Sequence, residues 1–227
     1  MQENGKHQFQ GNQISRIPCS PGLYAWYYKP LVIDSANIVK TLSSFLENTT
    51  AISTEVEMRY GLKLVSKSLL KAEFGSQKQS ASDIINQVVG QADNFFENFF
   101  KSNAVHSFSR PIYIGIAKNL KTRVYEQHYL KLIEMYNDDS PVNRYLSLHS
   151  NVNVQEVMDR LNLPHSFALE ARVRGIAPRD LAVNIFISNL LPNDIGGDSE
   201  DPQQETPARR ALERLLQLVA DPICGRQ

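Results

Sequence analysis

The residues most suited to chemistry lie in the stretch RPIYIGIAKNLKTRVYEQHYL, residues 110–130. An apolar run there breaks at Gly115, and a glycine inside a strand often marks the close approach of another backbone or of a ligand. A helix follows at once, and its first turns carry the cations Lys118, Lys121 and Arg123. The stretch therefore joins a strand that ends in Tyr-Ile-Gly directly to a cationic helix.

Two tyrosines form the second group of candidates. Side chains alternate along a strand, so Tyr113 and Gly115 share one face of a strand predicted at 111–117. Residues 22–28, GLYAWYY, are aromatic and predict another strand, from which Tyr24 could join that face. If the isoleucines of 111–117 meet the core, Tyr113 looks outward over the surface that Gly115 leaves bare. Ordinary strand packing of each tyrosine is the alternative.

The elements that must position these residues alternate between strands and helices. The predicted order is a strand at 22–28, a helical block at 31–109, a strand at 111–117, a helix at 119–136, a strand at 180–190 and a last helix from 207. This order indicates an α+β pattern around a small sheet. A further helix is expected near 153–162, and residues 191–205 are expected to form a solvated loop.

Local signals mark the ends and faces of the predicted helices. Asn119 can cap the helix after the second strand, and Thr206 with Pro207 suits the start of the last helix. The apolar face of the last helix is expected to consist of Leu212, Leu215, Leu216 and Val219. The strongest helical spacing in the helical block is that of Phe95, Phe96, Phe99 and Phe100. These phenylalanines predict a helix buried on its own core, or a surface for a partner or dimer, and stretches 34–48 and 62–74 are weaker helical candidates.

The composition argues against some classes and leaves others open. The 227-residue chain is 42% apolar, enough for a real core, and its 24 basic and 24 acidic residues give no net charge. This balance argues against a general nucleic-acid coat but not against a local basic patch. No run approaches the roughly 20 apolar residues that cross a bilayer, and the start lacks the apolar core of a signal peptide. Cys19 and Cys224 form no zinc or disulfide pattern, so we expect a cytoplasmic protein without a membrane partner.

The sequence PGLYAWYY followed by PIYIGIAKNLKTR resembles the GIY-YIG nuclease family, which is named after these two strand motifs. The first motif is GLY at 22–24, with leucine in place of isoleucine, and the second is YIG at 113–115, which matches in full. The following AKNLKTR is similar to the family's strand-to-helix turn, which ends in its catalytic arginine, here Arg123. The resemblance covers residues 18–30, 110–135 and 180–222.

The resemblance implies a small antiparallel three-stranded sheet flanked by helices, with residues 31–109 as a helical insertion between the first two strands. The nuclease domain would then consist of residues 1–30 and 110–227. In the family a third strand and a helix with a metal-binding glutamate follow, and DLAVNIFIS and Glu213 fit that order. Two features depart from the family pattern, namely the size of the insertion and the lack of an asparagine in the DPICGRQ that follows the glutamate helix.

The family's chemistry gives each of these residues an expected role. Hydrolysis of a phosphodiester needs an activated water, neutralised charge on the phosphate and help for the leaving oxygen, which a divalent ion on one carboxylate can supply. The expected roles are Mg²⁺ or Mn²⁺ binding by Glu213, phosphate stabilisation by Arg123, water activation or positioning by Tyr24, positioning of water or phosphate by Tyr113, and substrate contacts by Gly115, Lys118 and Lys121. A base role for Tyr24 requires nearby cations that favour its phenolate, such as these lysines or the metal.

His128 is a further candidate whose spacing is unusual. Family members often have a histidine one turn beyond the arginine, whereas His128 lies five residues after Arg123. That spacing is roughly 140° around an α-helix with 3.6 residues per turn. The two side chains can therefore point into one site only if the start of the helix is irregular. Packing is the alternative for His128, and Lys121, Tyr125 and Gln127 are possible substitutes.

The sequence thus predicts a metal-dependent endonuclease of GIY-YIG type that cuts DNA, in a stand-alone role such as restriction or phage defence. A homodimer is expected because two cuts in a duplex need two sites. Cationic groups near 110–123, 172–179 and 209–214 could face DNA, with scattered solvated charge as the alternative for 172–179.

Simpler interpretations remain for two of the residues and for the whole chain. Glu213 lies four residues after Arg209 and could form an ordinary surface ion pair with it. Arg123 could be a plain solvated helix residue. The competing hypothesis for the chain is a degenerate nuclease fold that binds nucleic acid or a partner protein without cleaving.

Overall fold

The computed structural model describes residues 7–38, 40, 92–102, 105, 109–188 and 207–224. The chain divides into two compact units, residues 1–31 with 100–227 and residues 32–99, and each is described by itself. Outside the described residues lie the predicted helical stretch at 62–74, most of the stretch at 34–48, the loop at 191–205 and the capping residue Thr206.

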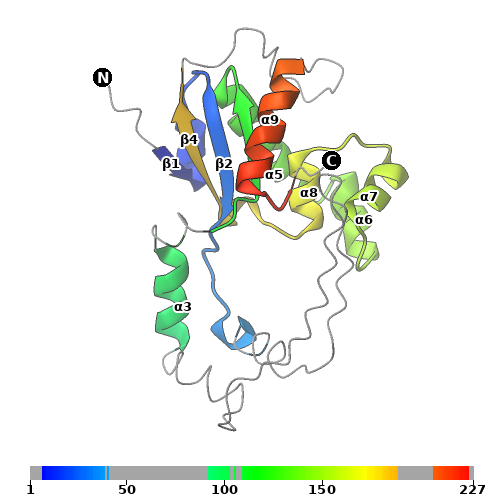
Figure 1. Cartoon of the computed structure of the whole chain (residues 1–227). Helices are drawn as coiled ribbons and strands as arrows, with labels where there is room; N and C mark the ends of the chain where they lie inside the picture. The colour runs from blue at the N-terminus through cyan, green and yellow to red at the C-terminus, as the bar shows by residue number, and fades with distance from the viewer. Residues whose placement is uncertain are drawn as a thin grey trace, which may run out of the picture. The chain divides into compact units, whose positions relative to one another are not determined.

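The larger unit is an α+β fold built on a four-stranded antiparallel sheet (Figure 1). Its strands are β1 (His7–Gln10), β2 (Gly22–Tyr28), β3 (Tyr113–Ala117) and β4 (Leu181–Ile187). Their spatial order is β1-β4-β2-β3, so β2 lies between β3 and β4. The strands predicted at 22–28, 111–117 and 180–190 are all confirmed, with slightly different ends for the last two.

The fourth strand, β1, extends the three that the sequence predicted. Its sequence, HQFQ, contains one apolar residue and lacks the longer alternating pattern that predicts a strand. The strand forms by backbone pairing with the edge of β4, and the Gln8 side-chain amide donates to Asn184 Oδ1 across the pair at 3.1 Å. Pairing with an existing edge, together with the packing of Phe9 against the core, therefore accounts for this strand.

Helical elements surround the sheet and extend from it (Figure 1). They are η1 (Gly11–Arg16), η2 (Lys121–Leu130), α5 (Lys131–Met135), α6 (Pro141–Leu148), α7 (Val154–Leu161), α8 (Phe167–Val173), η3 (Pro178–Asp180) and α9 (Pro207–Ala220). Helix α7 confirms the helix predicted near 153–162, whereas α6 and α8 were not predicted. Both begin at a serine, because Ser140 and Ser166 accept hydrogen bonds from first-turn backbone N–H groups. Within the described residues, no helix has the length and apolar character needed to cross a bilayer.

The helix predicted at 119–136 begins as a π-helix, η2, and continues as α5. In a π-helix the backbone hydrogen bonds join residues five apart. Such helices are rare in proteins, and those that occur often lie at functional sites. The Asn119 side chain accepts a hydrogen bond from the Thr122 backbone N–H at 3.2 Å, as expected for a capping residue. The prediction of a helix is thus confirmed, and its winding over the first ten residues differs from the α-helix assumed.

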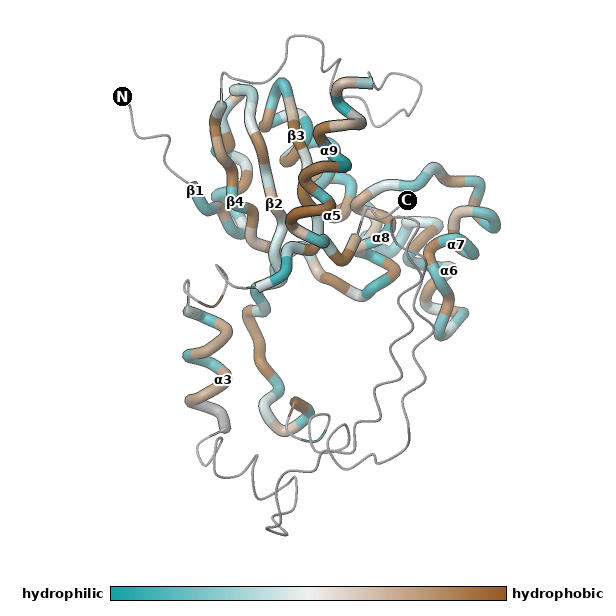
Figure 2. The backbone as a smooth tube through the Cα atoms, in the orientation of Figure 1, coloured by the Kyte–Doolittle hydropathy of each residue, from teal (hydrophilic) through white to brown (hydrophobic). Residues whose placement is uncertain are grey.

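Helix α9 begins at Pro207 as predicted but buries a different face. Leu215 and Val219, which were expected to line its apolar face, are 56% and 82% exposed. Arg209 is fully buried. The more buried side of the helix follows Arg209, Leu212, Glu213 and Leu216. Brown and teal segments alternate along α9 in Figure 2. The prediction was wrong here because α9 turns a charged pair, rather than its full set of leucines, toward β3.

The smaller unit is described at residues 32–38, 40 and 92–99. Helix α3 (Ala92–Lys101) begins in it and confirms the helical spacing of the phenylalanines. The rings of Phe95 and Phe99 stack with centroids 5.7 Å apart and are 40% and 43% exposed, whereas Phe96 is buried. The predicted burial of this stripe therefore holds for Phe96 and not for Phe95 or Phe99.

Candidate active site

Because Gly115 has no side chain, the phenol rings of Tyr24 and Tyr113 can lie next to each other over its position in the sheet. Tyr24 in β2 pairs with Gly115 in β3, and the Tyr24 and Tyr113 rings stack with centroids 6.1 Å apart. A Cβ added at Gly115 would lie 2.6 Å from Tyr24 Oη and 3.2 Å from Tyr113 Cε1. The prediction that Tyr24 joins the Tyr113 face is confirmed. The expected outward view of Tyr113 is wrong, because helical residues of η2 and α8 contact this face and leave Tyr24 1% exposed and Tyr113 half-buried.

Arg123 contacts this tyrosine pair from the first turn of η2. Its Nε donates to Tyr24 Oη at 3.3 Å, and its Nη1 donates to Gln127 Oε1 at 3.0 Å. The residue is only 5% exposed, so the interpretation of Arg123 as a solvated helix residue is wrong. Gln127, one of the possible substitutes for His128, thus lies beside Arg123.

His128 reaches the same tyrosines because η2 is wound as a π-helix. Residues five apart lie nearly one above the other in this winding, so Arg123 and His128 share a face. The His128 ring contacts Tyr24 and Tyr113 edge-on, with centroids 5.4 Å and 5.3 Å away. The condition set by the sequence, an irregular helix start, is met in the structure.

The protonation of His128 follows from its surroundings. Burial, followed by the charges of Arg123, Lys131 and Arg209, lowers its pKa well below the usual range for histidine. Trp26 Nε1 donates to His128 Nδ1 at 3.1 Å inside the core. His128 is therefore neutral at physiological pH.

Glu213 approaches the tyrosines from α9 together with Arg209. Arg209 Nε donates to Glu213 Oε1 at 3.3 Å, and Arg209 Nη2 donates to the backbone oxygen of Ile116 in β3 at 3.3 Å. The two side chains are 1% and 12% exposed. The ion pair expected as an alternative therefore exists, but it is buried against β3 and is not a surface pair. Arg209 belongs to this site and cannot face DNA as a surface cation.

Both tyrosines are held in their protonated form by these surroundings. Burial, followed by the neighbouring Tyr113, raises the pKa of Tyr24 well above its usual value, and Glu213 raises it further. Arg123 acts in the opposite direction and does not offset them. Burial is also the main cause of the raised pKa of Tyr113. Arg123 is the cation whose charge favours the phenolate of Tyr24 most, and its effect is smaller than that of burial.

The remaining predicted residues lie at the margin of the site. Lys118 is exposed in the turn after β3, and Lys121 is half-buried at the start of η2. The described part of the chain contains no group of three or more His, Cys, Asp and Glu side chains that could hold a metal. A metal at this site would therefore depend on Glu213 as its carboxylate ligand.

Two aromatic residues of the site were not predicted. Trp26 contacts His128 and lies two residues after Tyr24, so strand alternation alone could have placed it on the same face. Phe167, at the start of α8, stacks on His128 with centroids 4.8 Å apart and contacts Tyr113 at 5.4 Å. Phe167 comes from α8, which was not predicted, and no sequence signal links it to the motifs.

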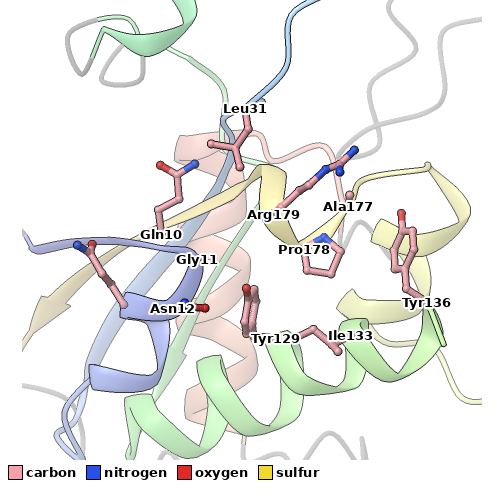
Figure 3. Close-up of a pocket in the computed structure, with 11 residues that line it drawn as sticks. Gln10, Gly11, Asn12, Leu31, Tyr129, Ile133, Tyr136, Ala177, Pro178 and Arg179 are labelled. Atoms are coloured by element: carbon pink, nitrogen blue, oxygen red, sulfur yellow. The ribbon is translucent and has the colours of Figure 1, made fainter.

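A cavity of about 860 Å³ in the same unit is separate from this site. Gln10, Tyr129, Ile133 and Arg179 are among the residues that line it (Figure 3). None of the predicted site residues does so. The Tyr129 ring also lies nearly parallel to Trp26, at 12° with centroids 6.4 Å apart, so one wall of the cavity supports the indole beside His128.

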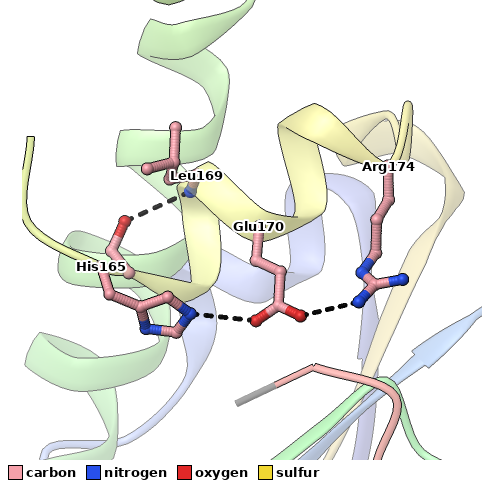
Figure 4. A network of polar contacts seen from close by, with 5 residues as sticks. His165, Leu169, Glu170 and Arg174 are labelled. Atoms are coloured by element: carbon pink, nitrogen blue, oxygen red, sulfur yellow. Dashed lines mark hydrogen bonds and ion pairs between the residues drawn. The ribbon is translucent and has the colours of Figure 1, made fainter. Parts of the chain in front are cut away.

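A second buried carboxylate, Glu170 in α8, lies in a different environment (Figure 4). Its Oε1 accepts from Arg174 Nη2 at 3.0 Å, and its Oε2 lies 3.2 Å from His165 Nε2. Cys224 lies close to the same group, and burial together with Glu170 raises the pKa of its thiol to about 12. The Cys224 backbone N–H donates to the backbone oxygen of Ile112, so the cluster fastens the end of the described chain to the start of β3.

Comparisons of the chain with family models, with characterised proteins and with solved structures gave no match.

Proposed function

We propose that this chain is a metal-dependent endonuclease that hydrolyses DNA phosphodiester bonds at a GIY-YIG-like site. The observation that carries the proposal is the convergence of side chains from η2 and α9 on the Tyr24 and Tyr113 rings of β2 and β3. The side chains that meet there are those of Tyr24, Tyr113, Arg123, His128 and Glu213. The fold supports the proposal because the GLY and YIG strands are adjacent and antiparallel, with β4 on the other side of β2.

Arg123 is the residue that binds the scissile phosphate. Its guanidinium is already oriented by Tyr24 and Gln127, and an oriented planar fork loses little freedom when it binds a phosphate. A buried cation also acts through a lower effective dielectric, which strengthens its attraction to the negative charge that develops during hydrolysis. Arg123 therefore stabilises the phosphate throughout the reaction.

Tyr24 and Tyr113 position water and phosphate as neutral phenols. Their raised pKa values keep the proton on each hydroxyl, and a phenol can both donate and accept a hydrogen bond. Of the two roles expected for Tyr24, we propose the positioning role, because burial beside Tyr113 and Glu213 favours the neutral phenol in the protein without a bound metal. The attacking water is oriented by the Tyr24 hydroxyl, and Tyr113 restricts its position from the neighbouring strand.

Glu213 holds the divalent ion in this proposal. Glu213 would supply a carboxylate, and Mg²⁺ and Mn²⁺ prefer oxygen ligands such as carboxylates and water. One carboxylate is enough for Mg²⁺, which usually keeps several waters. Arg209 fixes Glu213 Oε1 and so orients the carboxylate. When bound, the ion supplies positive charge to the leaving oxygen.

The proposed substrate, DNA, and the proposed role in restriction or phage defence are those that the sequence predicts. Lys118 and Lys121 flank the start of η2, where a DNA backbone bound at Arg123 would pass. A homodimer places two such sites on one duplex, as restriction or phage-defence enzymes require for a double-strand cut. Plasmid linearisation without accumulation of the nicked form would be the signature of such a dimer.

The deciding experiment is cleavage of supercoiled plasmid with Mg²⁺ or Mn²⁺. The natural protein should nick or linearise the plasmid, and EDTA and Glu213→Gln should each abolish that activity. Glu134→Gln, which changes an exposed glutamate on α5, is the matched control and should cleave normally. Cleavage that survives Glu213→Gln would refute the metal assignment, and cleavage that survives EDTA would refute the metal dependence.

A second candidate function is binding of nucleic acid or a partner protein without cleavage. The observation that favours it is the buried Arg209–Glu213 pair, in which a guanidinium already balances the charge that a metal would neutralise. Tight binding of duplex DNA that is insensitive to Mg²⁺, with no cleavage under any condition, would establish this candidate in place of the nuclease.

A further inference from the structure

Trp26 and His128 form a polar contact inside an otherwise aromatic part of the core. Trp26 is fully buried and His128 is 1% exposed. The indole Nε1 donates to His128 Nδ1 at 3.1 Å, although the two residues are 102 positions apart in the sequence. Water does not compete for either group at this depth, so the hydrogen bond determines the state of both rings.

Two further rings fix the direction of the indole N–H. The Phe167 ring lies at 13° to the indole with centroids 5.4 Å apart, and the Tyr129 ring lies at 12° with centroids 6.4 Å apart. Phe167 also stacks on His128, so it aligns the donor and the acceptor at once. The indole cannot rotate its N–H away from Nδ1 without disturbing this aromatic packing.

The donor-only character of the indole dictates where His128 carries its proton. An indole nitrogen donates and never accepts, so Nδ1 must present its lone pair. The proton of the neutral imidazole is then on Nε2, on the side of the ring away from Trp26. Protonation of Nδ1 would break the buried hydrogen bond and add a charge near Arg123, Lys131 and Arg209. His128 is thus restricted to one tautomer and one charge state.

We propose that Trp26 is a positioning residue that holds His128 as a neutral Nε2–H donor to the phosphate of the substrate. The proposal rests on the proposed nuclease function, because it assigns His128 the same phosphate that Arg123 binds. Both side chains emerge from the same face of η2, and the His128 ring contacts the two phenols that position the attack. A fixed neutral donor stabilises charge on a phosphate oxygen without titrating as the pH changes around neutrality.

The first test is nuclear magnetic resonance of the natural protein with ¹⁵N-labelled histidine and tryptophan, without substrate or metal. Trp26 is the single tryptophan of the chain, so its indole N–H signal needs no assignment. The expected result is a neutral His128 with its proton on Nε2 and an indole N–H that exchanges slowly with solvent. A proton on Nδ1, or an imidazolium at neutral pH, would overturn the proposal whether or not the protein cleaves DNA.

The second test compares two aromatic variants. Trp26→Phe removes the indole donor and keeps a ring, so Nδ1 should become able to take up a proton and His128 should show both tautomers. Phe167→Leu removes a stacked ring and keeps the donor, so the Nε2–H signature should persist even if stability falls. The same variants are then compared in plasmid cleavage, with kcat and KM determined separately.

Trp26→Phe should lower kcat about tenfold, the factor that corresponds to one hydrogen bond, with little change in KM. The indole donor favours the neutral imidazole, so its loss should also move the acidic side of the variant's pH profile to higher pH, which a merely structural role would not produce. An unchanged tautomer in Trp26→Phe would overturn the proposal. If the tautomers behave as expected and no variant cleaves DNA, the nuclease proposal fails and the phosphate role of His128 fails with it.

Discussion

Two largely buried glutamates of this protein have similar local sequences, but different groups surround their carboxylates. Glu170 and Glu213 each lie in a helix, four residues from an arginine with which they form an ion pair. Glu170 is held on one oxygen by Arg174 and on the other by His165. Glu213 is held on Oε1 by Arg209, and its charge acts on Tyr24 and Tyr113. The same spacing therefore serves a structural anchor in α8 and a candidate active-site carboxylate in α9.

The difference between the two glutamates shows that the spacing of a glutamate and an arginine does not determine the role of the carboxylate. A glutamate and an arginine four residues apart predict an ion pair, and both pairs form. The motif does not specify which groups the carboxylate faces on its other side. Glu170 contacts a histidine and lies close to a thiol near the end of the described chain, whereas the charge of Glu213 acts on the two phenols Tyr24 and Tyr113. The role of each carboxylate is thus determined by the strands and helices packed against it.

The largest effect that would test the difference between the two glutamates is expected when the charge of Glu213 is removed. Glu213→Gln keeps the size of the side chain and should reduce plasmid cleavage by about a thousandfold or more, because both metal binding and the local field are lost. Duplex binding, measured by a gel-shift assay in EDTA, should change little. If Glu213→Gln cleaves within about tenfold of the natural protein, Glu213 is as structural as Glu170 and the comparison fails.

The converse substitution, Glu170→Gln, should affect stability and leave the chemistry intact. The change removes the anion that Arg174 and His165 contact, and because both of these side chains are partly exposed, the free energy of unfolding should fall by about 2 kcal/mol, the range for lost charge-assisted hydrogen bonds. Urea unfolding at neutral pH measures this loss. Cleavage per folded molecule should stay within about twofold. A large loss of cleavage at full folding would assign Glu170 a part in the reaction.

The two arginines sharpen the comparison because their exposure differs. Arg209 is 1% exposed, whereas Arg174 is 44% exposed. Arg209→Gln leaves Glu213 buried without its cation and should cost about 2 to 3 kcal/mol of unfolding free energy. Arg174→Gln should cost below about 1 kcal/mol, because solvent screens the exposed end of that pair. Equal losses for the two variants in urea unfolding would show that burial does not distinguish the pairs.

A smaller effect is expected from pH, through the histidine at the tyrosine site. The pKa of His128 is lowered in the folded protein, so below the ordinary histidine pKa the unfolded chain binds one more proton than the folded chain. The contribution of neutral His128 to the free energy of unfolding should therefore be complete above about pH 6.5. Below that pH the free energy of unfolding should fall by up to about 1.4 kcal/mol per pH unit. His128→Gln should remove this part of the slope between pH 7 and 5. An unchanged slope would mean that His128 is not held neutral.

Local sequence signals were sufficient for the strands and for the tyrosine pair. Period-two alternation placed Tyr113 and Gly115 on one face, and the GLY motif placed Tyr24 in the neighbouring strand, as the pairing of Tyr24 with Gly115 confirms. The cap at Asn119 also follows from local chemistry. These predictions succeed because each depends on residues within one strand or one helical turn.

The predictions that failed depend on packing between distant segments. The buried face of α9 is set by what lies across from it, and the hydrophobic pattern of α9 pointed to Leu215 and Val219 instead. Phe167 enters the site from α8, a helix that was not predicted although Ser166 caps it, and nothing in the sequence places that helix against the tyrosines. The sequence also left open whether His128 could join Arg123, because the winding of η2 cannot be deduced from an α-helical wheel.

Because η2 is wound as a π-helix, the number of residues between two side chains does not by itself determine the angle between them around the helix axis. A histidine four residues after an arginine on an α-helix and one five residues after it on a π-helix reach nearly the same direction. A one-residue insertion between two site residues can therefore be absorbed as a change of helical winding, with the geometry of the site preserved. Deleting one exposed residue, such as Glu126, should convert η2 to an ordinary α-helix and keep the arginine and histidine together.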